Sequence, residues 1–458
     1  MGKDKKEYTP LQDRLSSRAG DVYFPLDNEI YDKYNVKRGL RYKDGTGVMA
    51  GLTSIGEVSG YNYVDGIKLP AEGHLRFRGY ELMDLVKHCE EEDRFGFEEV
   101  AYLLLFAKLP TKQELQSFSR YLGHERELPV GFTEDMILKA PSGNIMNKLG
   151  RCILASYSYD PNPDDTSIGN VLRQSIEIIA HLPVMAEYGY QAKRHYHDGQ
   201  SLVLHKPQAH LSTAENILYM LRDDNKYTKE EAELLDIMLI VHAEHGGGNN
   251  SAFTARVVSS TSTDTYSAIS AAIGSLKGPK HGGANAKVVA MMEDIKRNVK
   301  NWADEEEVSS YLEKIIKKEA FDGSGLVYGM GHAIYTLSDP RAVIIKNKAE
   351  SVVKDEPEKY KEFKLYTLIE KLTPEVFKKV KGIDKAMCAN VDLYSGFVYQ
   401  TLGIPEELYT PLFAISRIVG WCAHRLEEIH ACGKIIRPAY QSIPEPKQYI
   451  PIDEREEV

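Results

Sequence analysis

The sequence predicts a mainly α-helical protein with minor β-structure near its N-terminus. Apolar residues recur at helical spacing from about Tyr80 onward. Strands do not alternate with helices and no GxGxxG motif follows a strand, which argues against a Rossmann domain. The 458 residues exceed what one hydrophobic core usually serves, so two or three domains are expected.

Turns and short strands are predicted before the helices begin. Glycine-rich turns at 44–47 and 59–60 border an alternating stretch, and this pattern favours small strands around 61–64. Two apolar stripes follow, one opening at Met83 and the other at Val100. Their spacing predicts the first two helices of the body.

Three further helices are predicted in the middle of the chain. One follows an exposed loop and covers 168–189, and a second runs from a cap at Ser212 or Thr213 to about Leu221. The third covers 230–245 and is apolar nearly all round, so it is expected to be a central buried helix. The three glycines that follow it are a strong stop signal.

The remainder of the chain is also expected to be helical. Small residues at 268–274 predict a helix that lets two backbones approach closely. Two charged amphipathic helices are predicted within 286–320, and a Lys/Glu-rich helical region over 346–381. A final apolar helix is predicted over 412–432, followed by an extended arm at the C-terminus.

Composition favours a cytosolic protein without a nucleic-acid or membrane partner. The net charge is −10 and no basic run offsets it. The start of the chain lacks the apolar core of a signal peptide, and no stretch approaches the roughly 18 apolar residues of a membrane helix. No cysteine pair has CxxC spacing, so free thiols in a reducing compartment are expected. The cysteines are Cys89, Cys152, Cys388, Cys422 and Cys432.

Three short segments each place one titratable side chain among glycines, small residues or apolar residues. An aspartate and two histidines are sufficient for carbon acid chemistry, because the carboxylate can take a proton from carbon while the imidazoles polarise or protonate oxygens. The three side chains are His281 within 278–285, His332 within 329–333 and Asp392 within 390–396.

Two of these side chains also have a purely structural interpretation. His281 precedes a helix start near Asn285, where free N–H groups disfavour imidazolium; it either donates a hydrogen bond to an enol oxygen or caps its own turn. Asp392 lies between apolar residues, which should raise its pKa and make it a better base. Alternatively it caps the following helix, a role for which Asn390 and Ser395 are equally suited.

Two arginines are candidates for carboxylate binding. Arg341 follows the glycine-flanked His332 and is either a bidentate carboxylate ligand or the partner of Asp339 in a surface ion pair. Arg417 lies among apolar residues, where an unpaired charge is costly. It therefore needs an anion, either a substrate carboxylate or an internal Asp or Glu.

The remaining histidines raise the question of a metal site. Those in the polar stretch 195–210 fit no standard ligand spacing and have no cysteine beside them, so solvated loop histidines and no metal are expected. His242 and His245 share a helix face but lack a third ligand, and a substrate-facing His245 is the better interpretation. The histidines of the polar stretch are His195, His197, His205 and His210.

The segments around His281, His332 and Asp392 resemble signature blocks of the citrate synthase family. Further pieces agree in the same order, and the match covers roughly residues 45–445. These pieces are an early RGY block at 75–80, a helix-end HxDH block at 242–245 with Glu in place of Asp, and the C-terminal arginines Arg417 and Arg437.

The resemblance implies a role for each residue. Asp392 removes a methyl proton from acetyl-CoA, His281 stabilises the enol or enolate, and His332 hydrogen-bonds and then protonates the oxaloacetate ketone. Citryl-CoA is hydrolysed to citrate and CoA, the entry step of the tricarboxylic acid cycle, with no further cofactor. The implied oxaloacetate ligands are His245, Arg341, Arg417 and Arg437 of the partner subunit in a homodimer. The implied CoA contacts are the backbone of Val327, Tyr328, Gly329, Met330 and Gly331.

The family fold implies a large helical domain and a smaller inserted one. The large domain comprises 1–282 with 404–458, and the small domain comprises 283–403. His332 and Asp392 then lie on the small domain and His281 lies at the hinge. Closure would assemble the site only after oxaloacetate binds, which protects the thioester from futile hydrolysis.

The chain departs from the family pattern after His332. Many bacterial members carry a basic residue there that reaches the CoA phosphates, whereas 333–337 has none. Lys193, Arg194 and Lys346 are alternatives for that contact. The first 45 residues are not typical of NADH-inhibited hexamers, so a homodimer without strong NADH control is favoured.

Three rival functions stay open. The nearest is 2-methylcitrate synthase, which uses propionyl-CoA on the same scaffold. One methylene discriminates by only about 1–3 kcal/mol in an apolar pocket, so the sequence does not decide between the two thioesters. A zinc-dependent hydrolase built on the histidine-rich segments and a catalytically silent helical scaffold are the rivals from other classes.

Overall fold

The structure is a computed structural model that describes residues 5–23, 25–65, 67–383 and 385–455. The chain divides into two compact units, one formed by Met1–Ala50 with Arg437–Val458 and the other by Gly51–Ile436. The predicted inserted domain, 283–403, lies wholly within the second unit. The predicted boundary between a large and a small helical domain stays a prediction.

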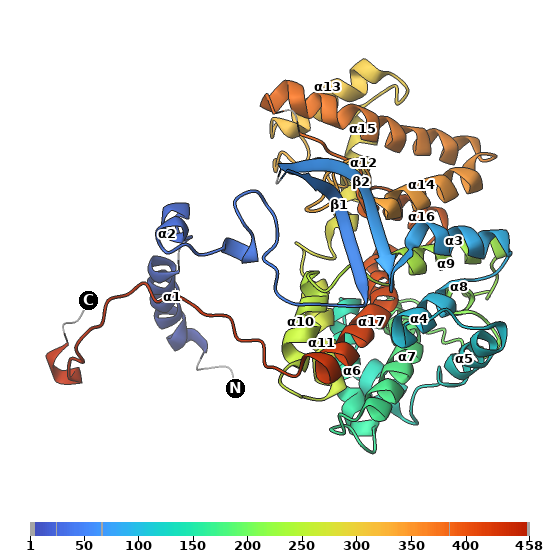
Figure 1. The fold of residues 1–458 in the computed structure, drawn as a ribbon, viewed down its shortest axis with the longest axis horizontal. Coiled ribbons are helices and arrows are strands. Elements are labelled where there is room, and N and C mark those ends of the chain that lie inside the picture. The colour runs from blue at the N-terminus through green and yellow to red at the C-terminus, as the bar shows by residue number, and fades with distance from the viewer. Residues whose placement is uncertain (1–4, 24, 66, 384, 456–458) are drawn as a thin grey trace. The chain divides into compact units, whose positions relative to one another are not determined.

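The first unit contains helices that the sequence analysis did not predict. α1 (Lys5–Val22) is followed by α2 (Asn28–Lys33), whose N-cap Asp27 accepts a hydrogen bond from the Glu29 amide at 3.2 Å. Residues 437–451, drawn in red in Figure 1, carry no regular secondary structure. A single 3-10 turn, Ile452–Glu454, follows. The end of the predicted C-terminal arm, 456–458, lies outside the described residues.

The second unit begins with an antiparallel hairpin. β1 (Gly56–Val64) pairs with β2 (Ile67–Phe77) so that Gly56 faces Phe77, and β2 pairs with the short β3 (Tyr80–Glu81). The predicted strands around 61–64 are therefore confirmed, but they are much longer than expected. β2 lies against α14 (Figure 1).

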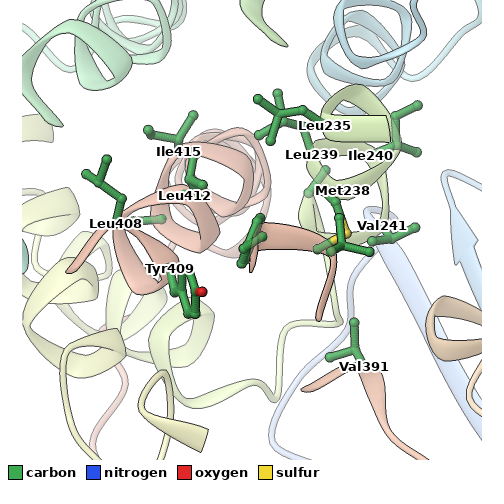
Figure 2. Packing of buried hydrophobic residues seen from close by; sticks show 14 of the residues in the cluster. Leu235, Met238, Leu239, Ile240, Val241, Val391, Leu408, Tyr409, Leu412 and Ile415 are labelled. Carbon is green, nitrogen blue, oxygen red and sulfur yellow. The ribbon is translucent and has the colours of Figure 1, made fainter. Parts of the chain in front are cut away.

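Helix α9 (Lys229–His242) is the central buried helix that the apolar run predicts. A capping box between Thr228 and Glu231 starts it. Leu235, Leu239 and their neighbours face the core that α17 (Tyr409–Glu427) shares (Figure 2). The helix ends at His242, three residues earlier than predicted. The chain turns away at Ala243, whose amide donates a hydrogen bond to the Ile240 carbonyl at 3.2 Å.

The other predicted helices are present with adjusted ends. The helix predicted over 168–189 extends to Tyr196, and Ser212 caps the helix that ends at Leu221 through a capping box with Glu215. The remaining helices of this unit are α3 (Leu82–Glu91), α4 (Phe97–Phe106), α5 (Lys112–His124), α6 (Ile145–Ser156), α7 (Ile168–Tyr196), α8 (Thr213–Leu221), α10 (Asn250–Ser259), α11 (Thr265–Leu276), α12 (Ala284–Asn298), α13 (Glu305–Ile316), α14 (Pro340–Val353), α15 (Pro357–Lys381) and α16 (Val391–Thr401).

The mainly helical class is confirmed. Within the described ranges, no helix is long and apolar enough to cross a membrane. Cys89, Cys152, Cys388 and Cys422 are buried free thiols, as predicted. The side chain of Cys432 lies outside the described residues.

Candidate active site

Apart from Arg437, the predicted site residues come from separate stretches of the second unit, and a ring contact and electrostatic interactions link several of them. The His245 ring lies edge-on to the His332 ring, with centroids 5.4 Å apart. Arg417 of α17 donates from Nε to the His242 carbonyl at 2.6 Å, just before the His245 loop. The charge of Arg417 acts on His245 and on His281.

The loop that carries His332 is tied to the start of α16, which carries Asp392. The Gly331 amide donates to the Cys388 carbonyl at 2.8 Å, and the Asn390 amide donates to the Gly329 carbonyl at 2.9 Å. Gly329 has φ +82°, and a Cβ there would lie 2.8 Å from the Leu393 Cα. Only glycine allows this close approach, which couples the two catalytic candidates.

The β-hairpin braces the same loop from its other side. The Ala71 amide donates to Thr336 Oγ1 at 3.1 Å, and the Gly73 amide donates to Ser338 Oγ at 3.0 Å. A Cβ on Gly60 would lie 2.7 Å from the Tyr335 Cα. The hairpin therefore contributes to the position of His332, although it lies more than 250 residues away in the sequence.

His332 is held in one orientation by its own loop. Its Nδ1 accepts from the backbone amides of Ile334 and Tyr335, both at 3.1 Å, and its ring stacks on the Tyr335 ring at 4.7 Å. Because Nδ1 is an acceptor, a neutral His332 carries its proton on Nε2. Sequence reasoning missed Tyr335, which is 2% exposed and supplies both the stacking ring and one of the amides.

His281 is fixed by Ser251 rather than by its own turn. Its Nε2 lies 3.1 Å from Ser251 Oγ, which also accepts from Trp421 Nε1 at 3.1 Å and lies 2.8 Å from Asn249 Oδ1. The N-cap of α12 is Gly283, and the hydrogen bond of the His281 ring goes to Ser251, which does not favour the alternative of a histidine that caps its own turn. Burial, with the charge of Arg417, lowers the pKa of His281 to about 4, which keeps the imidazole neutral at pH 7.

Asp392 does not cap its helix. Asn390 does so, accepting from the Asp392 amide at 2.9 Å. Burial raises the pKa of Asp392 to about 6, against the opposing charge of Arg341. The predicted desolvated carboxylate is therefore present, and the competing capping interpretation is contradicted.

Arg341 and Arg417 differ in how their charge is balanced. Arg341 forms a bidentate pair with Asp339, at 3.0 Å from Nε and 2.7 Å from Nη2, but the pair is buried rather than on the surface. Arg417 is 1% exposed, and its Nη1 and Nη2 have no hydrogen-bond partner among the described residues. Burial lowers the pKa of Arg417 to about 10, although Glu244 lies nearby.

A buried guanidinium with two free nitrogens is a strong anion site. Leaving such a group unpaired is costly, so the arrangement is stable only with a bound anion or with partial compensation from a nearby charge. His245 Nε2 is likewise buried without a partner among the described residues. Together they offer a forked cation and a ring nitrogen to a small anionic ligand.

Four other basic residues were predicted as substrate contacts. Arg437 is exposed and belongs to the first unit, so its role stays a prediction. Lys193, Arg194 and Lys346 already pair with Asp198, Asp223 and Glu370, at 2.8, 2.9 and 2.6 Å.

The histidine-rich stretch forms no metal site in the described part of the chain, where no three His, Cys, Asp or Glu side chains are grouped to hold an ion. His195 and His205 bond instead to the backbone carbonyls of Gln200 and Asp223, at 2.8 and 3.2 Å.

Comparison with known proteins gives a consistent result. A family model described as "Citrate synthase, C-terminal domain" matches residues 42–439. The chain is 32% identical to a citrate synthase of Synechocystis sp. over 94% of this chain and 96% of that one. It is 31% identical to 2-methylcitrate synthase 1 of Corynebacterium glutamicum, over 92% and 98% of the two chains. The ternary complex of Thermoplasma acidophilum citrate synthase with carboxymethyl coenzyme A and oxaloacetate superposes with a TM-score of 0.72 at 27% identity, covering 91% and 99%.

Proposed function

The chain belongs to the citrate synthase family, and from that premise we propose that Asp392, His281 and His332 carry its condensing reaction. Acetyl-CoA condenses with oxaloacetate, and citryl-CoA is hydrolysed to citrate and CoA. The observation that best supports this assignment is the buried anion site at Arg417, whose charge acts on His245 and His281, together with the raised pKa of Asp392.

The chemistry is acid–base catalysis at carbon. Asp392, as the carboxylate, takes a proton from the methyl carbon of the thioester, and His281 donates a hydrogen bond to the enol or enolate oxygen. The enol carbon then attacks the ketone of oxaloacetate while His332 protonates the ketone oxygen. The proton on Nε2 of His332 is the one available for this step, because Nδ1 is occupied by two backbone amides.

Ser251 determines which nitrogen of His281 can act. Its single hydroxyl proton goes either to Asn249 Oδ1 or to His281 Nε2. If it goes to Nε2, a neutral His281 carries its proton on Nδ1 and can donate it to an oxygen. The serine is thus proposed to select the tautomer that stabilises the enolate.

Replacing Ser251 by alanine is expected to lower kcat about tenfold, the effect of losing one neutral hydrogen bond in the transition state. The KM for oxaloacetate should stay within about twofold, because Ser251 does not contact the anion site. Steady-state kinetics with saturating oxaloacetate measure this. Ser270→Ala, which removes a serine bonded to the Gly150 carbonyl at 2.9 Å, is the matched control. An unchanged kcat in the Ser251 variant would contradict the assignment.

Oxaloacetate is proposed to bind with one carboxylate on Arg417 and the other near Arg341, with His245 beside them. Arg437 of the partner subunit completes the site in a proposed cytosolic homodimer. The CoA moiety is proposed to meet the backbone of 327–331. Lys193, Arg194 and Lys346 have carboxylate partners already, which does not favour them as phosphate ligands.

The deciding experiment follows release of free CoA thiol from acetyl-CoA and, separately, from propionyl-CoA, with and without oxaloacetate. We expect oxaloacetate-dependent release that is faster with acetyl-CoA. Faster release with propionyl-CoA would assign the chain to 2-methylcitrate synthesis, as in the relative from Corynebacterium glutamicum. Release of thiol from neither thioester would favour the catalytically silent scaffold. Release that needs no oxaloacetate and is stopped by a chelator would indicate a zinc-dependent hydrolase.

The fall in kcat/KM at low pH is expected to follow the protonation of Asp392. The carboxyl must be ionised to act as a base, and its pKa is raised to about 6. The kcat/KM is therefore expected to fall about tenfold for each pH unit below about 6, and to level off above it. The measurement is kcat/KM between pH 4.5 and 8, with circular dichroism at each pH to confirm folding. A plateau that continues to pH 4.5 in the folded protein would sink the assignment.

A further inference from the structure

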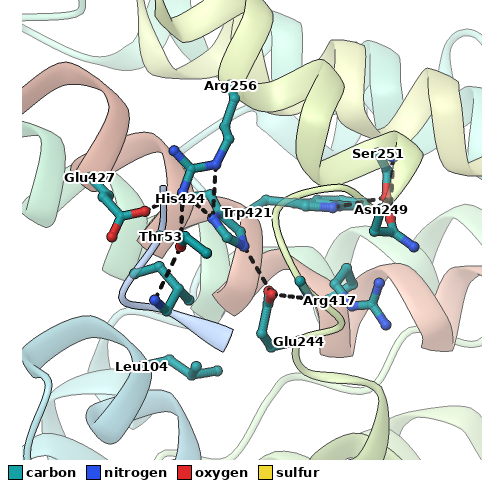
Figure 3. Close-up of polar contacts among 12 residues, drawn as sticks. Thr53, Leu104, Glu244, Asn249, Ser251, Arg256, Arg417, Trp421, His424 and Glu427 are labelled. Atoms are coloured by element: carbon teal, nitrogen blue, oxygen red, sulfur yellow. Dashed lines mark hydrogen bonds and ion pairs between the residues drawn. The ribbon is translucent and has the colours of Figure 1, made fainter. Parts of the chain in front are cut away.

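Three buried polar side chains form a line that ends beside Arg417 (Figure 3). Glu244 follows α9, His424 lies on α17 and Arg256 lies on α10. Glu244 and His424 are both fully buried, and Arg256 is 6% exposed. The catalytic steps proposed above use none of the three.

The hydrogen bonds between these side chains show which nitrogen of His424 carries its proton. His424 Nδ1 accepts from Arg256 at 3.1 Å from Nε and 2.7 Å from Nη2. Nδ1 therefore carries no proton, and the Nε2–H of His424 donates to Glu244 Oε1 at 2.9 Å. Arg256 is held in turn by Glu428 Oε2 at 2.8 Å and by Glu427.

Glu244 is the acidic side chain whose charge most offsets that of Arg417, yet the two do not pair. Glu244 Oε2 has no hydrogen-bond partner among the described residues, and neither do Nη1 and Nη2 of Arg417. Two glycines leave room for the carboxylate where it now lies. A Cβ on Gly56 would come within 2.9 Å of Glu244 Oε1, and one on Gly420 would collide with Oε2.

We propose that His424 and Arg256 are positioning residues that hold the Glu244 carboxylate away from Arg417, so that Nη1 and Nη2 of Arg417 stay open to a substrate carboxylate. The proposal rests on the proposed function, in which Arg417 binds oxaloacetate. It explains why a buried carboxylate and a buried guanidinium, both with unused hydrogen-bonding capacity, lie close together without forming a salt bridge.

The physical argument is one of competition. If the hydrogen bond from His424 is lost, Glu244 keeps only the Gly246 amide as a donor to Oε1, and it lies beside a buried guanidinium with two free nitrogens. Each would then satisfy the other, since an unpaired buried charge is costly. A substrate carboxylate would have to displace this internal partner, and its apparent affinity would fall by the fraction of sites that remain open.

The test is a double-mutant cycle on oxaloacetate binding, measured by isothermal titration calorimetry with the full chain. His424→Phe removes the donor and should raise the dissociation constant at least about tenfold. Glu244→Gln alone should not weaken binding, because the amide carries no charge to pair with Arg417. In the double variant the dissociation constant should return to within about threefold of the unsubstituted protein. His424→Gln, which can still accept from Arg256 and donate to Glu244, should keep most of the affinity.

A purely structural role for His424 predicts the opposite pattern. The second substitution would then add to the damage, and Glu244→Gln alone would also weaken binding; either result overturns the proposal. Where the phenylalanine variant does not fold, His424→Asn replaces it, because asparagine is too short to bond Glu244. The same test applies: adding Glu244→Gln should restore oxaloacetate affinity. Absence of oxaloacetate binding in the unsubstituted protein would instead overturn the proposed function.

Discussion

Replacing Asp392 by asparagine is expected to lower kcat by about 10²–10⁴-fold, the contribution usual for a positioned general base. Asparagine has nearly the same shape and leaves the helix cap intact, because Asn390 provides that cap through the backbone amide of residue 392. It cannot accept a proton from carbon at neutral pH. The loss should therefore appear in turnover rather than in folding.

Oxaloacetate binding separates this effect from damage to the site. Asp392 contributes no hydrogen bond to Arg417, so the dissociation constant for oxaloacetate should change by less than about threefold. Thiol release gives kcat and calorimetry gives the affinity. Glu306→Gln, which neutralises an exposed carboxylate on α13, is the control for a lost charge. Near-normal turnover in the asparagine variant would exclude Asp392 as the base.

The helices were predictable where local signals mark them. α8 begins after Ser212, one of the two caps predicted, and α9 begins at Lys229, one residue before the predicted start at 230. The glycines at 246–248 marked the end of α9 only to within three residues. The chain leaves the helix where Gly420 of α17 donates to the Ala243 carbonyl at 3.2 Å, a contact with a residue 177 positions away.

The hairpin shows the same limit more strongly. β2 contains proline, glycine and charged residues and has no strict alternation, so its composition hides a strand of eleven residues. Its order comes from the partner strand and from hydrogen bonds to Thr336 and Ser338. Long-range pairing of this kind leaves no signal in the local pattern.

The candidate site was predictable in its titratable groups but not in what holds them. Asp392, His281 and His332 stand out among small and apolar neighbours. Ser251 and Tyr335 do not, since a serine after two asparagines and a tyrosine in a loop have many ordinary roles. Only the folded geometry shows that one bonds His281 and the other stacks on His332.

Replacing Arg417 by methionine is expected to change affinity and stability in opposite directions. Oxaloacetate should bind about 2–5 kcal/mol more weakly, or roughly 30- to 5,000-fold, because a carboxylate would lose a desolvated forked partner. The folded protein without ligand should lose little stability or gain some. Two guanidinium nitrogens are now buried without partners, and a methionine of similar length removes that cost at the expense of one bond to the His242 carbonyl.

Arg425 on the same helix is the matched control. It is also fully buried, but it donates to Thr265 Oγ1 at 3.0 Å, Ser259 Oγ at 3.2 Å and the Thr263 carbonyl at 2.7 Å. Arg425→Met should therefore lower the thermal midpoint while oxaloacetate affinity changes little, the reverse of Arg417→Met. Calorimetric binding and thermal unfolding of both variants give the comparison. Equal loss of stability in the two variants, with oxaloacetate affinity retained in Arg417→Met, would show that Arg417 is a structural arginine. An arginine that serves to bind an anion should instead destabilise the fold until the anion is bound.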